Sequence, residues 1–152
     1  MNDKARRAIT NQAQGRNMEL FAQHYFEEKG SHLEIINSDI DAELDGKYFI
    51  EIKSTHITYS RKQTEIRNKK KYQYHYPETQ GRVKINKLIH EQLAKDIDPK
   101  TIWYMFIFIG KHAQIIGFLP YSEVTELLSK TEANTTINIT RIMDRMILEL
   151  PE

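Results

Sequence analysis

The sequence predicts an α/β domain in which a central mixed β-sheet is flanked by helices. Residues 102–109 are eight consecutive apolar residues rich in aromatic and β-branched types, which is typical of a strand buried on both faces. An apolar stripe at helical spacing precedes this strand, and further helical stripes follow it. Helical and strand patterns therefore mix along one chain of 152 residues, with no linker that divides it.

The first expected element is a helix near the N-terminus. Residues 1–10 are polar and predict a flexible arm, so that a single domain would cover residues 11–152. Asn11 followed by Gln14 indicates a helix start, and Gly30 indicates its end. The apolar stripe of this helix is Met18, Phe21, Ala22 and Tyr25.

Three strands are expected next. Residues 33–36 form the first, and residues 39–53 form two more that are joined by an Asp-Gly turn. Residues 54–81 show no clear periodicity and contain Pro77 and Gly81, which predicts a long loop with room for a short helix. Such a loop in a compact domain is more often functional than not.

The second half alternates between helices and strands around the long apolar strand. In the helix expected over residues 86–95, one face is apolar, and we expect its His90 to be a surface residue, with DNA contact as the alternative. That apolar face consists of Ile85, Leu88, Ile89 and Leu93. The other expected elements are a strand over 113–119, a helix capped by Ser122, a short strand around 137–139 and a closing helix over 142–150.

The composition excludes several kinds of site. The sequence has no cysteine, which rules out disulfides, thiolate zinc sites and cysteine nucleophiles, and which fits a reducing compartment. No apolar stretch reaches membrane-spanning length, and the polar N-terminus does not have the pattern of a signal peptide. We therefore expect a cytoplasmic protein with no membrane partner.

Charged side chains in the hairpin form a candidate metal site. Glu51 and Lys53 alternate with Ile50 and Ile52, so both charged side chains leave the strand on one face. A second carboxylate from the preceding strand would complete a pair of oxygen ligands of the kind that Mg²⁺ prefers. Such a metal can activate water for attack on a phosphodiester, and a lysine beside it can orient that water or stabilise developing charge.

The turn register decides which aspartate faces Glu51. A loop formed by residues 44–46 would place Asp39 opposite Glu51, whereas a loop formed by residues 45–47 would place Asp41 there. A strict two-residue turn would place neither aspartate on that face. A bulge in the first strand would change this arithmetic, so the sequence alone leaves both residues as candidates.

These residues resemble the PD-(D/E)xK nuclease superfamily. Residues 15–19, with the pattern Gly-x-x-x-Glu, are followed by a strand, an acid and the Glu-x-Lys-Ser of residues 51–54, which is most similar to archaeal Holliday-junction resolvases. The similarity covers residues 12–56, and Ser38 precedes Asp39 where the superfamily's name has proline. It implies a restriction-endonuclease-like core, with the order helix, three strands, helix, two strands and helix.

The resemblance also implies roles for individual residues. The spacing from Asp41 to Glu51 is family-like, so Asp41 is the first choice of metal ligand, together with Glu51, while Asp39 is the alternative. Glu19 lies at the edge of the apolar stripe, from which an acid can turn toward a site between helix and sheet. The catalytic set implied is Glu19, Asp41, Glu51 and Lys53, with Mg²⁺ as cofactor and Mn²⁺ able to replace it.

A basic segment follows the candidate site. Between Ser54 and Lys84 there are eight Lys and Arg residues against two Glu, a net charge of +6, while the whole chain carries +1. Cations there can bind phosphates, and the interleaved tyrosines can stack on bases or pack against sugars. The candidate DNA-binding residues are Arg61, Lys62, Arg67, Lys69, Lys70, Lys71 and Arg82.

The leading interpretation is a Mg²⁺-dependent DNA endonuclease of the junction-resolving or repair type. Cutting two strands symmetrically requires two active sites, so we expect a homodimer. The alternatives are a restriction-type endonuclease and a catalytically inactive nucleic-acid-binding module of the same fold. An unrelated interaction domain is the third class, because exposed Glu–Lys pairs on hairpins are common on solvated surfaces.

Overall fold

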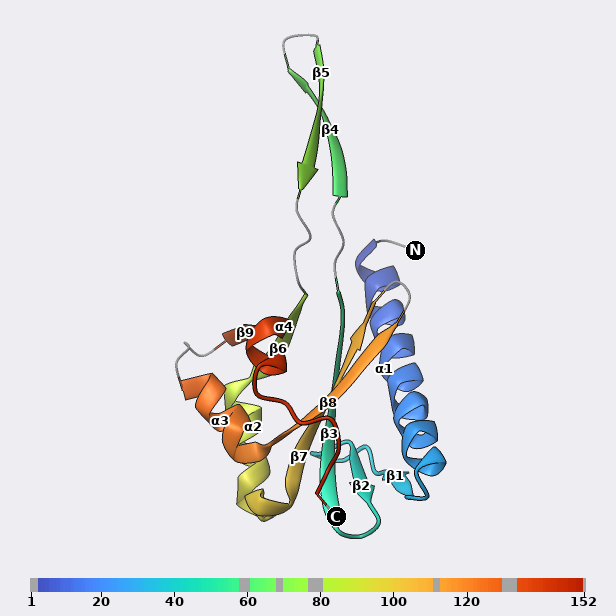
Figure 1. Cartoon of the computed structure of the whole chain (residues 1–152), viewed down its shortest axis with the longest axis vertical. Helices are drawn as coiled ribbons and strands as arrows, with labels where there is room; N and C mark the ends of the chain where they lie inside the picture. The colour runs from blue at the N-terminus through green and yellow to red at the C-terminus, as the bar shows by residue number, and fades with distance from the viewer. Residues whose placement is uncertain are drawn as a thin grey trace.

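A five-stranded mixed sheet forms the centre of the computed structural model (Figure 1), which describes residues 3–57, 61–67, 70–76, 81–110, 113–129 and 134–151. In their order across the sheet, the strands are β1 (Leu33–Ile35), β2 (Ala42–Leu44), β3 (Tyr48–His56), β7 (Ile102–Ile109) and β8 (Gln114–Pro120). The pair β3–β7 is parallel, and the other neighbouring pairs are antiparallel. The expected α/β class with a mixed central sheet and flanking helices is therefore confirmed.

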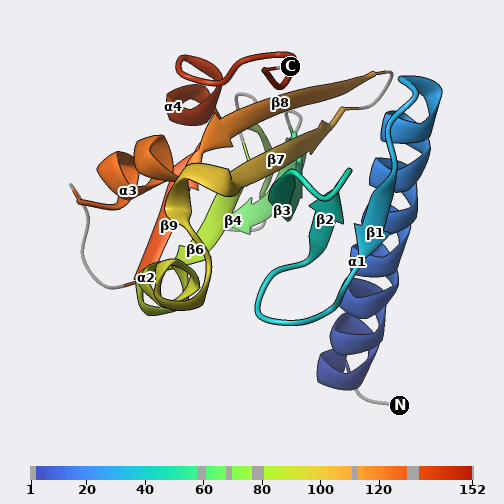
Figure 2. The same cartoon turned by 90° about the horizontal axis from the view of Figure 1, so that it is seen from below.

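Helices cover both faces of this sheet, as Figure 2 shows. Helix α1 (Asp3–Glu28) lies on one side, and α2 (Lys87–Asp96), α3 (Tyr121–Ser129) and α4 (Ile139–Met143) lie on the other. The remaining elements are β4 (Arg61–Arg67), β5 (Lys70–Tyr76), β6 (Arg82–Asn86), the 3₁₀ helix η1 (Pro99–Thr101) and β9 (Asn134–Asn138). Strands β4 and β5 form a hairpin of their own, and β6 pairs with β9.

Strand β7 divides the hydrophobic core into two clusters. Trp103, Met105 and Ile107 pack in the cluster that includes Ala22 and Phe26 of α1. The alternate residues of β7 pack in the cluster of α2, α3 and α4 on the opposite face; they are Ile102, Tyr104, Phe106 and Phe108. All seven residues from Ile102 to Phe108 are buried, so the prediction of a strand buried on both faces is confirmed.

The ends of two helices follow the sequence signals. Helix α1 ends at Glu28, and Gly30 has a φ of 81° beside hydrogen bonds that return to the last turn of the helix. Helix α2 is capped by Asn86, whose side chain accepts hydrogen bonds from the amides of Leu88 at 3.0 Å and Ile89 at 3.2 Å. Helix α1 begins earlier than expected, because residues 3–10 already form its first turns.

The expected long loop over residues 54–81 is wrong for most of its length. Strand β3 continues to His56, β4 and β5 pair as a hairpin, and β6 follows from Arg82. A two-stranded ribbon of polar and aromatic residues does not need the alternating apolar face that marks a core strand, so the hydrophobic pattern gave no signal. Figure 1 shows this hairpin extending away from the five-stranded sheet.

Two further expectations fail in the second half of the chain. Leu88 and Ile89 of the expected apolar face are 73% and 55% exposed, because α2 turns His90 inward beside Leu93, which is buried as expected. The closing helix stops at Met143, and Ile147 then exchanges two backbone hydrogen bonds with Phe118, at 2.8 and 2.9 Å. Strand pairing to β8 thus satisfies backbone groups that the expected helix would have bonded internally.

No helix in the part of the chain that the structure describes is both long and apolar enough to cross a membrane.

Gly81 lies where the start of β6 passes the end of β3. A Cβ atom at this position would overlap the carbonyl oxygen of His56 and lie 3.0 Å from Oγ1 of Thr55. We expect Gly81→Ala to lower the free energy of unfolding by about 1–3 kcal/mol, because the backbones must separate. A Cβ at Gly15 of α1 would meet nothing within 4 Å, so Gly15→Ala should raise the free energy of unfolding by about 0.5–1 kcal/mol. Urea denaturation of both variants is the measurement, and equal effects would contradict the close approach at Gly81.

Candidate active site

The hairpin register brings Asp41, and not Asp39, opposite Glu51. Strand β2 pairs Ala42 with Ile50 and Leu44 with Tyr48, so the connecting loop consists of residues 45–47. Continuing this register by one residue sets Asp41 against Glu51, whereas Asp39 lies two residues further along and is exposed. Of the three turn registers that the sequence allowed, the structure has the one that favours Asp41.

The loop keeps this register because both the side chain and the backbone of Asp45 are hydrogen-bonded to His32. Asp45 and Gly46 have φ angles of 53° and 65°, a conformation that aspartate and glycine tolerate better than most residues. The amide of His32 donates to Oδ1 of Asp45 at 2.7 Å, and the amide of Asp45 donates to the carbonyl of His32 at 2.9 Å. The chain before β1 therefore holds the turn that aligns β2 with β3.

Asp41 is held against β3 by its side chain. The backbone N–H of Ile52 donates to Oδ2 of Asp41 at 2.8 Å, and the carbonyl of Asp41 accepts from the amides of Ile36 and Asn37 at 2.8 and 3.3 Å. Strand β2 begins only at Ala42. Beside Glu51, the edge of β3 is therefore bonded by the side chain of Asp41 and not by a backbone ladder. The sheet thus fixes the position of Asp41 without burying it completely.

Glu51 is a buried acid, with only 8% of its surface exposed. Burial, a hydrogen bond with the Asp41 side chain and the negative charge of Asp41 together raise the pKa of Glu51 to about 9, against the opposing effect of Lys53. At neutral pH the carboxyl of Glu51 is therefore protonated and hydrogen-bonded to Asp41. Ionisation of Glu51 would place a second negative charge, a buried one, beside that of Asp41, which is unfavourable.

Lys53 and Glu19 lie at the margins of this pair. Lys53 follows Glu51 on the same face of β3, and its positive charge lowers the pKa of Glu51. Glu19 is half-buried on α1, where burial and then the charge of Asp41 raise its pKa, while Arg16 lowers it. Glu19 is thus coupled to Asp41. We call Glu19, Asp41, Glu51 and Lys53 the acidic cluster.

The acidic cluster suits a cation, although it is not a complete metal cage. Within the described ranges, no three His, Asp or Glu side chains are grouped closely enough to hold a metal ion. Asp41 and Glu51 nevertheless offer carboxylate oxygens, and with both groups ionised a positive partner is needed. A hard divalent cation that keeps several of its waters needs only one or two protein carboxylates. The donor set therefore fits Mg²⁺ or Mn²⁺ better than a cation that needs an all-protein cage.

The candidate DNA-binding residues lie on other elements than the acidic cluster. Most of them fall on the β4–β5 hairpin, which extends beyond the five-stranded sheet in Figure 1. Arg82 is exposed on β6, and Lys69 lies outside the described residues. The candidates on the hairpin are Arg61, Lys62 and Arg67 on β4 and Lys70 and Lys71 on β5.

Sequence reasoning missed a buried polar network beside Glu51. Tyr104 pairs in register with Glu51, and its pKa is raised by burial and then by the charge of Glu51. Its hydroxyl is 2.7 Å from Nδ1 of His90, whose Nε2 is 2.8 Å from Oγ1 of Thr125. His90 is only 2% exposed and stacks on Tyr121, so both expectations for it, a surface position and DNA contact, are wrong. A tyrosine in the middle of an apolar strand was the available signal, because its hydroxyl needs a partner.

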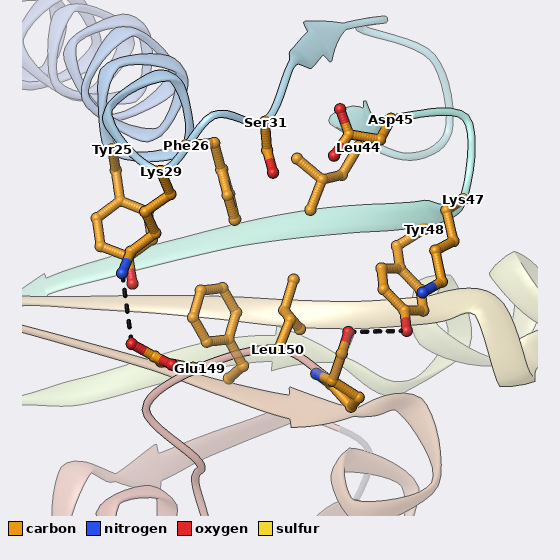
Figure 3. A pocket seen from close by; sticks show the side chains of 12 residues that line it. Tyr25, Phe26, Lys29, Ser31, Leu44, Asp45, Lys47, Tyr48, Glu149 and Leu150 are labelled. Carbon is orange, nitrogen blue, oxygen red and sulfur yellow. Dashed lines mark hydrogen bonds and ion pairs between the residues drawn. The ribbon is translucent and has the colours of Figure 1, made fainter.

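A cavity of about 370 Å³ lies at the other end of β3 (Figure 3). It is lined by the end of α1, the hairpin turn and the C-terminal segment, and no member of the acidic cluster borders it. Lys29 and Glu149 form an ion pair across it at 3.6 Å, and the Tyr48 hydroxyl donates to the carbonyl of Pro151 at 3.2 Å. These contacts anchor the C-terminal segment.

The acidic cluster remains the strongest candidate for chemistry among the described residues. It combines a buried acid of raised pKa, a carboxylate fixed by the backbone and a nearby lysine. Comparisons with protein-family models, with curated proteins and with solved structures found no match to this chain.

Glu51 should make the stability of the metal-free protein depend on pH. Folding raises its pKa from 4.5 to about 9, so its contribution is fully present below pH 4.5 and is lost as pH rises through about 9. In chelator, we expect the free energy of unfolding of the wild type to fall between about pH 6 and pH 9. Glu51→Gln cannot ionise, and at pH 9 it should be more stable than the wild type by at least about 1 kcal/mol.

Urea denaturation at both pH values measures this difference. Glu34→Gln, which removes an exposed acid from β1, is the matched control and should keep the wild-type pH dependence. If Glu51→Gln loses stability between these pH values as steeply as the wild type does, Glu51 is not the group responsible.

His90 should stay neutral at physiological pH. Burial lowers its pKa from 6.5 to about 4, so its contribution to stability is fully present above pH 6.5 and is lost as pH falls toward 4. We expect the ring signals of His90 in an NMR titration to remain unchanged from about pH 8 down to about pH 5. The exposed His24 and His32 provide the references in the same spectra. Titration of His90 near pH 6.5 would contradict the buried hydrogen-bonded network.

Proposed function

We propose that this protein is a metal-dependent DNA endonuclease whose active site is the acidic cluster. The observation that carries the proposal is the buried Glu51, hydrogen-bonded to the half-buried Asp41, with Lys53 two residues further on the same strand face. A solvated hairpin surface would leave such residues exposed and independent of one another. A buried acid whose pKa is raised by a neighbouring acid is instead typical of functional sites.

Each residue has a distinct role in this proposal. Asp41 and Glu51 would hold Mg²⁺ or Mn²⁺ through carboxylate oxygens. When bound, the cation acidifies water and neutralises charge on the phosphate. Lys53 donates hydrogen bonds to the attacking water or to the phosphate oxygens as their charge grows. Glu19, coupled to Asp41, accepts a hydrogen bond from that water and helps to orient it.

The order of the elements also supports the proposal. When β4, β5 and β6 are set aside, α1 is followed by three strands, then by α2 and by the pair β7 and β8, which is the order expected for a restriction-endonuclease-like core. In the central sheet β3, which carries Glu51 and Lys53, runs parallel to β7. The hairpin β4–β5 and the pair β6–β9 lie outside the five-stranded sheet.

DNA is the proposed substrate, and a homodimer is the proposed active form. The basic segment that follows β3 supplies the positive charge that phosphate binding needs. Symmetric cutting of a junction or a duplex would require the active sites of two copies. A nucleic-acid-binding module without catalysis is the second candidate, and it would bind through the same basic segment.

Cleavage assays on the purified protein separate these two functions. We expect plasmid DNA and a four-way junction to be cut with Mg²⁺ or Mn²⁺ and to remain intact in chelator. Asp41→Ala should abolish cleavage, while Asp39→Ala, its matched control two residues away and exposed, should at most weaken it. Lys53→Ala should still bind DNA and Mn²⁺ but cut about a hundredfold more slowly, because its contribution grows in the transition state.

The outcomes identify which candidate is correct. DNA binding without cleavage, with every metal tested, would support the non-catalytic module. Two results would show that the acidic cluster is not the active site. One is a wild-type cleavage rate in Lys53→Ala, and the other is a greater loss of cleavage in Asp39→Ala than in Asp41→Ala. Single-turnover rates measured beside a Mn²⁺ titration distinguish loss of the metal from loss of the chemical step.

A further inference from the structure

The register of the β4–β5 hairpin sorts its residues onto two different faces. Paired positions share a face, and successive positions along each strand alternate between faces. The pairing matches Arg61 with Tyr76 and Arg67 with Lys70 at its two ends. Three tyrosines of β5, at every second position, therefore fall on one face; they are Tyr72, Tyr74 and Tyr76.

The two faces of the ribbon differ in chemistry. The face that holds the three tyrosines has Arg61 at one end and both Arg67 and Lys70 at the other, with Gln63 paired to Tyr74 and the acid Glu65 paired to Tyr72 between them. We call it the tyrosine face. The opposite face holds no tyrosine; its positions are Lys62, Thr64, Ile66, Lys71, Gln73 and His75.

We propose that the tyrosine face binds unpaired bases of single-stranded DNA. Aromatic side chains stack on bases of any sequence, and cations beside them contact the phosphates of the same strand. The ribbon is a two-stranded sheet separate from the five-stranded sheet, and it extends away from that sheet (Figure 1).

The spacing of the tyrosines favours single strands over duplex. Positions i and i+2 on a strand are about 6.8 Å apart, twice the rise of about 3.4 Å per residue. Bases stacked in a duplex are also about 3.4 Å apart, and each base covers the face of its neighbour. Successive tyrosines can therefore each meet a base only where the strand is extended and the bases are unstacked.

Binding of single strands by the tyrosine face adds a substrate class to the proposed nuclease. The link from this binding to cleavage rests on the proposed function. The ribbon lies beyond the end of β3, the strand that carries Glu51 and Lys53 (Figure 1). Single-stranded DNA on the ribbon would then adjoin DNA at the acidic cluster. The substrates expected are branched, flapped or gapped DNAs in preference to continuous duplex.

Binding measured in chelator tests the tyrosine face independently of cleavage. The probes are a labelled single strand of about 12 nucleotides, the matching duplex, and the same single strand with abasic sites replacing most bases. We expect wild-type protein to bind the intact single strand at least about tenfold more tightly than either of the other two probes. Equal binding of the intact and the abasic strand, or of the single strand and the duplex, would overturn the proposal.

Two triple variants localise the binding to one face. Tyr72→Ala, Tyr74→Ala and Tyr76→Ala together should weaken single-strand binding by about a hundredfold or more and abolish the preference for bases. The matched control on the opposite face combines Thr64→Ala, Gln73→Ala and His75→Ala, and should bind within about threefold of the wild type at pH 8. Loss of binding in the control, or its retention in the tyrosine variant, would overturn the assignment.

Single substitutions cover the case in which the tyrosine triple variant does not fold. Tyr74→Phe keeps the ring and should bind like the wild type, while Tyr74→Leu should bind about five- to tenfold more weakly. The salt dependence of binding should be unchanged in Tyr74→Leu and flatter in the Arg67→Ala, Lys70→Ala double variant, whose residues lie on the tyrosine face, since only cations release counterions. Identical binding of the Phe and Leu variants would exclude stacking. Base-dependent binding without cleavage would disprove the proposed nuclease and leave the tyrosine face standing.

Discussion

The hydrogen bond from the backbone of Ile52 to the carboxylate of Asp41, at 2.8 Å, is the interaction on which the acidic cluster depends. It sets a loop residue against the edge of β3, where β2 has not yet begun, and so places a second carboxyl beside Glu51. A one-residue change of register would move Asp41 to the other face of the strand pair. The contacts between Asp45 and His32 at the far end of the hairpin prevent this, so the turn and the acid pair act as one unit.

The central strand β7 imposes the second constraint. Because every residue from Ile102 to Phe108 is buried, any polar group on this strand needs an internal partner. Tyr104 finds one in His90, which in turn requires Thr125 and stacks on Tyr121. A polar chain therefore joins α2 and α3 to the strand position next to Glu51. The hydrogen bonds of Tyr104, next to Glu51, thus also tie α2 and α3 to the central sheet.

Much of this architecture could be predicted from the sequence, because core strands and capped helices leave local signals. The two-sided burial of residues 102–109, the helix end at Gly30 and the cap at Asn86 followed directly from residue types. The choice between Asp39 and Asp41 required the register, which depends on whether the three-residue loop begins at Leu44 or at Asp45. The hairpin over residues 61–76 could not be found from apolar periodicity, and the closing helix was displaced by long-range pairing of Ile147 with Phe118.

That pairing has a consequence for the behaviour of the protein in solution. Strand β8 is the last strand of the five-stranded sheet, and an uncovered edge of this kind can pair with another chain. The segment after α4 returns across it through Ile147, and the contacts of Glu149 and Pro151 hold that segment down. The segment thus pairs with the edge of β8 at Phe118, and removing it by proteolysis or truncation would free the backbone groups of Phe118 for pairing with another chain.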